Sequence, residues 1–193
     1  MALPKNMRNA FTPAEIEFLA ESDTISIIPR QRMDQLQLIN GSFGPFRPPI
    51  KQDVPVWLAI TLKQKHKCQI QPPNWMDVEF LREKIEEENA NEEFSALPFR
   101  YMETAHLLLA CASDDVPQAD LVRTLLKDLR EARQRKARQG LQALDPYYLQ
   151  MDNLGLMEIN EIRPFFSKAF NELRRLVPSD ASDSQATTAA LIG

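Results

Sequence analysis

The sequence predicts an α+β fold that is mainly α, with a small β-rich domain followed by a helical bundle domain. Segments of β type occur before Pro72-Pro73, and apolar residues recur at three- and four-residue steps after it. The two consecutive prolines interrupt any regular element and mark the boundary. The predicted organisation is a flexible N-terminus at residues 1–11, a β-rich domain at 12–71, a helical domain at 72–178 and a disordered tail at 179–193.

The β-rich domain is predicted to begin with a short helix. Thr-Pro-Ala-Glu at positions 12–15 combines a capping box with proline at the first helical position. Two β-type segments follow at 24–28 and 35–39, and Asn40-Gly41 is a turn signal. A unit of roughly 60 residues buries only about 60% of its unfolded surface, so we expect it to dock on another part of the protein.

The rest of this domain returns to a helical pattern. Residues 56–62 predict a helix that runs into a basic cluster at Lys63–Lys67, and Cys68–Ile70 is expected to be a closing strand.

The helical domain is predicted to contain four helices. The first begins at a cap on Asn74 and runs into an acidic stretch at Glu86–Glu93, expected to be a solvated helix end and linker. The second covers residues 99–112, and the last has Pro164 in its first turn.

The third and longest helix is predicted over 117–141, about 37 Å at 1.5 Å per residue. Asp114 or Asp115 is placed to cap it. Val122, Leu125 and Leu129 recur at helical spacing and predict a packing face.

The second half of that helix is basic, with five Lys or Arg residues between positions 130 and 138. Three interpretations stay open: a solvated surface, a face for an acidic protein partner, and a nucleic-acid contact. The formal net charge of −4 and the absence of interleaved aromatic residues weigh against nucleic acid.

Residues arranged for catalysis are not found. The sequence has no phosphate-binding glycine loop, no metal-ligand motif and no nucleophile elbow. His106 is expected in or near the core, and Cys68 and Cys111 are expected to be buried reduced thiols. We therefore predict a protein that is not an enzyme and has no metal or cofactor. The apolar run at 107–112 is too short to span a bilayer, so a soluble intracellular protein is expected.

Bulky apolar residues are numerous for two small domains, which favours a subunit interface. The set predicted to face the core or a partner also includes one arginine of the long helix. The partner-facing candidates are Val122, Leu125, Leu129, Arg133, Phe165, Phe166 and Phe170.

Five motifs carry a family resemblance: 41–46, 56–70, 72–79, 113–128 and 152–160. Their most specific residues are Trp57, Pro72, Pro73, Trp75, Asn153, Met157, Glu158 and Asn160. In order and spacing, residues 12–177 closely resemble the Psf-two subunits of the eukaryotic GINS complex. The N-terminal extension and the Ala/Thr-containing tail depart from that pattern.

The resemblance implies a heterotetramer of four related subunits, each with a helical domain and a β-rich domain. It implies that the complex joins the minichromosome maintenance ring and its helicase cofactor in the nucleus. Together they form the active replicative DNA helicase in initiation and elongation of replication. ATP hydrolysis then belongs to the ring, this subunit is non-catalytic, and its DNA contact is indirect or weak. The alternative is an accessory nucleic-acid-binding module that uses Arg130–Arg138.

Overall fold

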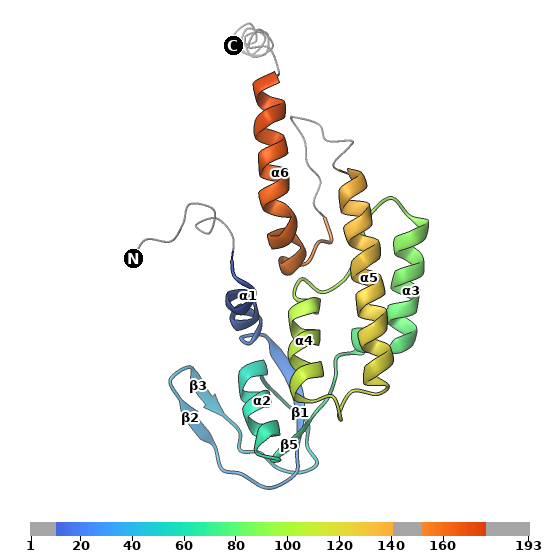
Figure 1. Cartoon of the computed structure of the whole chain (residues 1–193). Coiled ribbons are helices and arrows are strands. Elements are labelled where there is room, and N and C mark those ends of the chain that lie inside the picture. The colour runs from blue at the N-terminus through green and yellow to red at the C-terminus, as the bar shows by residue number, and fades with distance from the viewer. Residues whose placement is uncertain (1–10, 141–151, 177–193) are drawn as a thin grey trace, which may run out of the picture.

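The computed structural model describes residues 11–140 and 152–176. This part of the chain is mainly helical and contains two small sheets near the N-terminus, so the predicted fold class is confirmed (Figure 1). The predicted flexibility of residues 1–10, the helix end at Leu141 and the disordered tail at 179–193 concern residues outside the described ranges.

The N-terminal elements alternate between strands and short helices. They are α1 (Pro13–Ala20), β1 (Thr24–Pro29), β2 (Leu36–Leu38), β3 (Gly41–Phe43), β4 (Gln52–Pro55), α2 (Val56–Gln64) and β5 (Cys68–Ile70). The later elements are helical throughout. They are η1 (Asn74–Met76), α3 (Val78–Ala90), α4 (Tyr101–Cys111), α5 (Ala119–Gly140) and α6 (Leu156–Leu176).

The predicted capping box starts α1. The Glu15 backbone N–H donates to Thr12 Oγ1, and the Thr12 N–H donates to the Glu15 carboxylate. These bonds satisfy backbone donors that have no partner inside a helix, so they define where α1 begins. The helix then packs on α4 and α6 rather than on the strands.

The larger sheet has the order β4-β1-β5 with antiparallel pairing. Ile25 and Ile27 of β1 point inward, opposite Val54 and Ile70 of the neighbouring strands. This alternation is what the sequence pattern predicts for a half-buried strand. β2 and β3 form a separate two-stranded ribbon that extends to one side of the sheet (Figure 1).

The strand-rich part shares one core with the helices. Its buried side chains continue without interruption through Leu81 and Leu108 to Leu129. Lys63 at the end of α2 strengthens this union, because its Nζ lies 2.7 Å from Asp114 and 2.8 Å from Asp115 in the loop before α5. Asp115 also accepts the Ile70 backbone N–H at 2.7 Å. The expected docking of the small domain therefore includes a buried ion pair.

α3 and α5 lie side by side, and α4 packs beside α5 (Figure 1). Val122, Leu125 and Leu129 are buried on the packing face of α5, with Val122 and Leu129 fully inaccessible. α6 starts beside α1 and α4 and then extends past the rest of the bundle. Of the residues that the structure describes, none belongs to a helix with the length and apolar character needed to cross a membrane.

Three predicted helix starts were wrong. Asn74 does not cap the first helix of the helical domain, because residues 74–76 form η1 and α3 begins at Val78 with Asp77 as its cap. α5 begins at Ala119, after Gln118 at a φ of +52°, and Asp114 and Asp115 pair with Lys63 instead of capping it. α6 begins at Leu156, so Pro164 lies inside it and is exposed. A proline removes one helical hydrogen bond, and the carbonyl it leaves without a partner can be solvated on an exposed face.

Candidate partner interface and buried charge cluster

Arg133 is the centre of a buried charge cluster. It extends from α5 with 2% of its surface exposed. Its Nε and Nη2 donate to the two oxygens of Glu158 at 2.7 and 3.0 Å, while Nη1 donates to Glu88 at 3.1 Å. Nη2 also donates to the Asn153 carbonyl at 2.6 Å. The planar guanidinium suits this paired recognition of a carboxylate.

Neighbouring groups also contact the two carboxylates, although Glu88 Oε1 has an ion pair and no hydrogen bond. The Tyr101 hydroxyl and the Gly155 backbone N–H each donate to Glu158 at 2.8 Å. The Ser95 backbone N–H and hydroxyl donate to Glu88 at 2.9 and 2.6 Å, and Lys136 forms an ion pair with Glu88 at 2.8 Å. The cluster therefore joins α3, α4, α5, α6 and the loop after α3.

The electrostatics of the cluster favour the ionised forms of Glu88 and Arg133. Burial opposes the charge of Glu88, but Lys136, Ser95 and Arg133 outweigh it and lower the pKa of Glu88. Burial likewise opposes the charge of Arg133, but Glu158 outweighs it and raises the pKa of Arg133. Charges buried with matched partners in this way organise a fold, since removal of one partner leaves the other uncompensated.

The sequence interpretation of these residues needs two corrections. Arg133, predicted to face a partner, is buried inside its own chain, and Glu88, expected in a solvated stretch, is 2% exposed. A signal was present in the sequence. Arg133 and Ala137 continue the three- and four-residue spacing of Val122, Leu125 and Leu129, so the buried stripe of α5 runs through the basic half.

The motif residues 152–160 are explained by this neighbourhood. Asn153 adopts a φ of +61° and donates from Nδ2 to the Phe94 carbonyl at 3.1 Å. Asn160 bonds both backbone groups of Phe11, accepting at 2.9 Å and donating at 2.8 Å, which ties the start of α1 to α6. Met157 is half-buried beside Glu158.

Of the remaining motif residues, Pro72, Pro73 and Trp75 lie where the strand-rich part meets the helical part, whereas Trp57 packs inside the strand-rich part. Pro72 and Pro73 connect β5 to η1. The Trp75 ring packs edge-on against Tyr101 with centroids 6.4 Å apart, and Trp57 packs in the same way against Phe43 at 6.2 Å. The structure thus places these residues in packing roles.

The basic half of α5 is largely committed to internal pairs. Arg130 pairs with Glu161 and Lys136 with Glu88, and Arg133 is buried. Among the described Lys and Arg residues of this stretch, only Arg135 and Arg138 have no acidic partner. Such an arrangement does not favour the interpretation of Arg130–Arg138 as a phosphate-binding surface.

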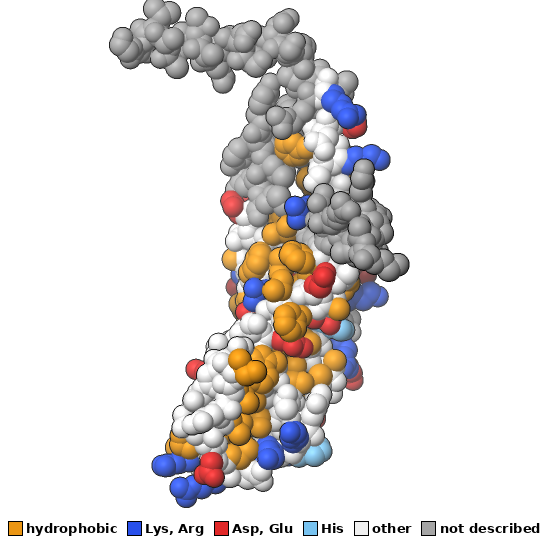
Figure 2. Space-filling model, turned by 90° about the vertical axis from the view of Figure 1, so that its left-hand side faces the viewer, with side chains coloured by type: hydrophobic (Ala, Val, Ile, Leu, Met, Phe, Trp, Pro, Cys, Tyr) orange, Lys and Arg blue, Asp and Glu red, His pale blue; other side chains and the backbone are white. Residues whose placement is uncertain are grey.

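An apolar groove lies between the C-terminal half of α5 and α6. It has a volume of about 330 Å³ and is lined by Gln134, Ala137, Arg138, Glu161, Ile162, Phe165 and Phe166. Phe165 is 60% exposed, and Phe166 and Phe170 are half-buried. Figure 2 shows hydrophobic side chains gathered on the side of the molecule that carries α1 and α6, where Phe18 of α1 is 70% exposed. Large exposed aromatic residues in one region are typical of a protein–protein interface.

His106 and Cys68, two described side chains with catalytic potential, have separate local contacts. His106, expected near the core, is exposed, because its position on α4 faces α1. Its Nδ1 lies 2.7 Å from the carboxylate of Glu17. Burial raises the pKa of the Cys68 thiol to about 11, so this thiol stays protonated. In residues 11–140 and 152–176 no group of His, Cys, Asp or Glu is arranged to hold a metal ion.

Comparison with known families and proteins covers nearly the whole chain. The family described as "PSF2 N-terminal domain" matches residues 12–71, and the "GINS complex protein helical bundle domain" matches residues 75–177. These two matches fall on the strand-rich part and on the helical part.

Curated relatives of similar sequence are named as PSF2 proteins of the GINS complex. The chain is 47% identical to "DNA replication complex GINS protein psf2" of Schizosaccharomyces pombe, over 92% of this chain and 97% of the relative. It is 42% identical to the protein of that name from Homo sapiens, over 89% of this chain and 97% of the relative. The protein of that name from Xenopus laevis is 43% identical, over 84% and 90%.

Proposed function

Since the chain belongs to the PSF2 family of GINS complex proteins, we propose that it is a non-catalytic, structural subunit of a heterotetrameric GINS complex in the nucleus. Its partners are the three other GINS subunits. The proposal rests on one observation: the family match extends over both parts of the chain and includes the residues that build its buried charge cluster.

The assembled complex has a further role in this proposal. It joins the minichromosome maintenance ring and its helicase cofactor, and together they form the active replicative DNA helicase in initiation and elongation. ATP hydrolysis belongs to the ring. The sequence supports this division of labour, because it contains no phosphate-binding glycine loop.

The region we assign to subunit contact is the α5–α6 groove with Phe165 and Phe166. An exposed phenylalanine gains most when a partner covers it, since burying an aromatic side chain contributes about 1.5–3 kcal/mol. Val122, Leu125 and Leu129 have a different role, because they are buried against the chain's own helices. Charged substitutions at these three positions act on folding first.

Co-expression tests the assembly. The chain is produced with the three other subunits, as wild type and as Phe165→Asp/Phe166→Asp, and mass is measured by light scattering after size exclusion. We expect a tetramer with the wild type and loss of this chain from the complex with the double variant. Ile50→Asp, at an equally exposed position in the strand-rich part, is the matched control and retains the tetramer.

Two results would contradict the proposal. A wild-type chain that elutes as a stable monomer in the presence of all three partners removes the assembly role. A tetramer that persists with the double variant removes the α5–α6 groove from the interface and leaves the family role in place.

A further inference from the structure

Positive charge is concentrated in residues 24–71, whereas the preceding residues 12–23, which include α1, contain four Asp or Glu residues and no Lys or Arg. Residues 24–71 contain seven Lys or Arg residues and two Asp or Glu residues, in a chain whose formal net charge is −4. The overall acidity therefore conceals a strongly basic region. A local charge of one sign attracts partners of the opposite sign whatever the net charge of the molecule.

Six of the seven cations form no ion pair with a described acidic residue, although the pKa of Asp114 is lowered by Lys63 and also by Arg30, which lies close enough to contribute. Lys63 is paired with Asp114 and Asp115, but no ion pair or hydrogen bond of the described residues involves the side chains of the others. These six, which we call the unpaired cations, are Arg30, Arg32, Arg47, Lys51, Lys65 and Lys67. Lys67 is half-buried and the other five are exposed.

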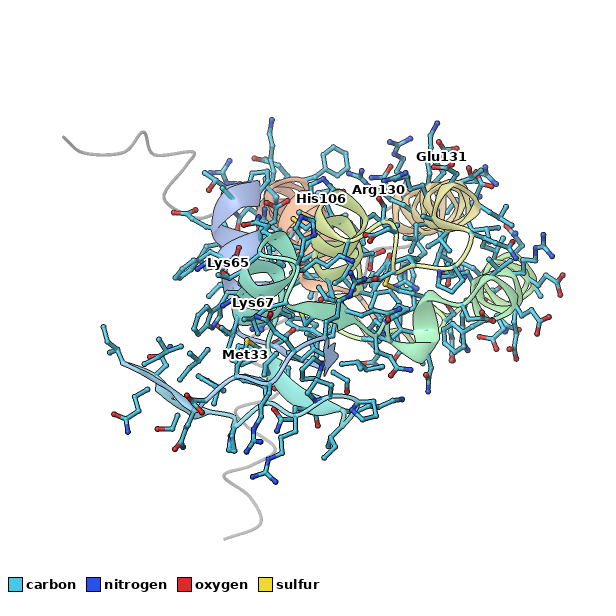
Figure 3. The ribbon with its side chains drawn as sticks, turned by 90° about the horizontal axis from the view of Figure 1, so that it is seen from below. Met33, Lys65, Lys67, His106, Arg130 and Glu131 are labelled. Carbon is cyan, nitrogen blue, oxygen red and sulfur yellow. The ribbon has the colours of Figure 1, made fainter. Side chains whose placement is uncertain are left out.

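The fold brings the backbone of Arg30 next to Lys67 and that of Arg32 next to Arg47, near the base of the β2–β3 ribbon. The Arg30 backbone N–H donates to the Lys67 carbonyl at 2.8 Å, which places the end of β1 against the turn after α2. Met33 and Phe46 form a β-bridge that continues the ribbon, and Arg32 and Arg47 are their chain neighbours. Figure 3 shows Met33, Lys65 and Lys67 close together in the view from below.

Aliphatic side chains are exposed in the same region. Ile39 at the tip of the ribbon is fully exposed, and Leu38 and Ile50 are exposed as well. The aromatic residues point inward, because Phe46 is buried and Phe43 packs on Trp57. Single-stranded nucleic acid is usually held by exposed aromatic rings that stack on bases, so this surface suits it poorly.

The open backbone edges of the β2–β3 ribbon are a third feature of this surface. β2 pairs only with β3 among the described strands, so each keeps an outer edge with free N–H and C=O groups. An open edge of this kind accepts an extended chain by main-chain hydrogen bonding, and alternate side chains of that chain then meet the surface beside it.

We propose that the β2–β3 ribbon, from the unpaired cations at its base to Leu38 and Ile39 at its tip, is a docking surface for an extended acidic segment of a partner protein, in which carboxylates alternate with aliphatic side chains. The carboxylates meet the unpaired cations, and the aliphatic side chains cover Leu38, Ile39 and Ile50. This surface lies at the opposite end of the molecule from the α5–α6 groove (Figure 1). It is thus separate from the subunit contact proposed above.

The test uses the tetramer formed by co-expression and a fluorescein-labelled peptide in which glutamate alternates with valine. Binding is followed by fluorescence anisotropy. Arg32→Glu/Lys67→Glu is expected to weaken binding about tenfold or more, because two attractive contacts become repulsive. Arg82→Glu/Arg135→Glu changes the net charge equally on exposed positions of the helical part and is expected to leave binding unchanged. Ile39→Ser/Ile50→Ser tests the aliphatic contribution and weakens binding without a change of charge.

Each remaining outcome overturns the proposal. Equal binding of a lysine–valine peptide, or equal loss with Arg82→Glu/Arg135→Glu, shows non-specific association. Binding of labelled oligo(dT) or duplex DNA at Arg32 and Lys67, without binding of the peptide, assigns the surface to nucleic acid. Loss of the tetramer with Arg32→Glu/Lys67→Glu assigns it to subunit assembly. The same titration on the full chain as a soluble fusion keeps this test independent of whether the tetramer forms.

Discussion

The helical part and the strand-rich part of this chain use their cations in opposite ways. Arg133 is enclosed by Glu88, Glu158 and backbone carbonyls, whereas Arg32 extends into solvent without an acidic partner. Both are arginines in locally basic stretches of sequence. A basic stretch of sequence can therefore hold both structural charges and surface charges, which differ in whether the folded chain buries them.

The largest expected difference is between Arg133→Met and Arg32→Met. The first leaves Glu158 buried without a cation and leaves Glu88 with Lys136 alone, which costs about 3–5 kcal/mol of unfolding free energy. The second removes an exposed side chain and changes stability by less than about 0.5 kcal/mol. Pulse proteolysis in urea, read on a tag on this chain within the complex, measures both. Similar losses of unfolding free energy for the two variants would contradict this difference between the two arginines.

A smaller effect is expected at Lys63, the cation of the strand-rich part that is paired. Burial opposes its charge, but Asp114 and Asp115 outweigh it and raise the pKa of Lys63. Lys63→Met leaves Asp115 buried without a cation and is expected to cost about 2–3 kcal/mol, less than Arg133→Met because Asp115 keeps the Ile70 N–H. Hydrogen exchange of the Ile70 amide should accelerate, while Lys65→Met should leave it unchanged.

The smallest effect concerns Glu103, a buried acid with no cation in hydrogen-bond contact. Its two carboxylate oxygens have no hydrogen-bond donor in bonding geometry, and burial raises the pKa of Glu103. Because the folded pKa lies above the ordinary value of 4.5, its stabilising contribution is present below that value and is lost as pH rises through the folded pKa. Glu103→Gln is therefore expected to stabilise the chain by about 1 kcal/mol at neutral pH.

The pH dependence gives the control for that variant. Urea titrations with the same chain-specific readout at pH values from acid to neutral should show the advantage of Glu103→Gln shrinking toward acid pH. The contribution of Glu88 to stability depends on pH in the opposite direction, because its lowered pKa gives stability that is lost as pH falls below the ordinary value of 4.5. A constant advantage of Glu103→Gln over the whole range would contradict a raised pKa.

Local patterns in the sequence were sufficient for most of the elements. The capping box at Thr12 and Glu15 starts α1 as expected, because its hydrogen bonds form within one turn of chain. The alternation of Ile25 and Ile27 yields β1, and the spacing of Val122 and Leu129 yields the buried face of α5. Each of these signals depends on neighbours a few residues away.

Long-range pairing explains the errors at Asp114 and Pro164. Asp114 stands where a helix cap is expected, yet its carboxylate meets Lys63 from a distant segment. Pro164 resembles a first-turn residue, but the Glu158 contact with Arg133 and the bond from Leu156 N–H to the Phe99 carbonyl extend α6 to an earlier start. Partners so far apart in sequence leave no local pattern.

Periodicity, caps and motif spacing are properties of contiguous chain, so they were sufficient to predict the fold class, the main helices and the family. Which charges are buried depends instead on contacts between distant segments. Arg133 and Arg135 lie two positions apart, but successive residues of a helix point in different directions. One therefore enters the cluster of Glu88 and Glu158, and the other faces solvent.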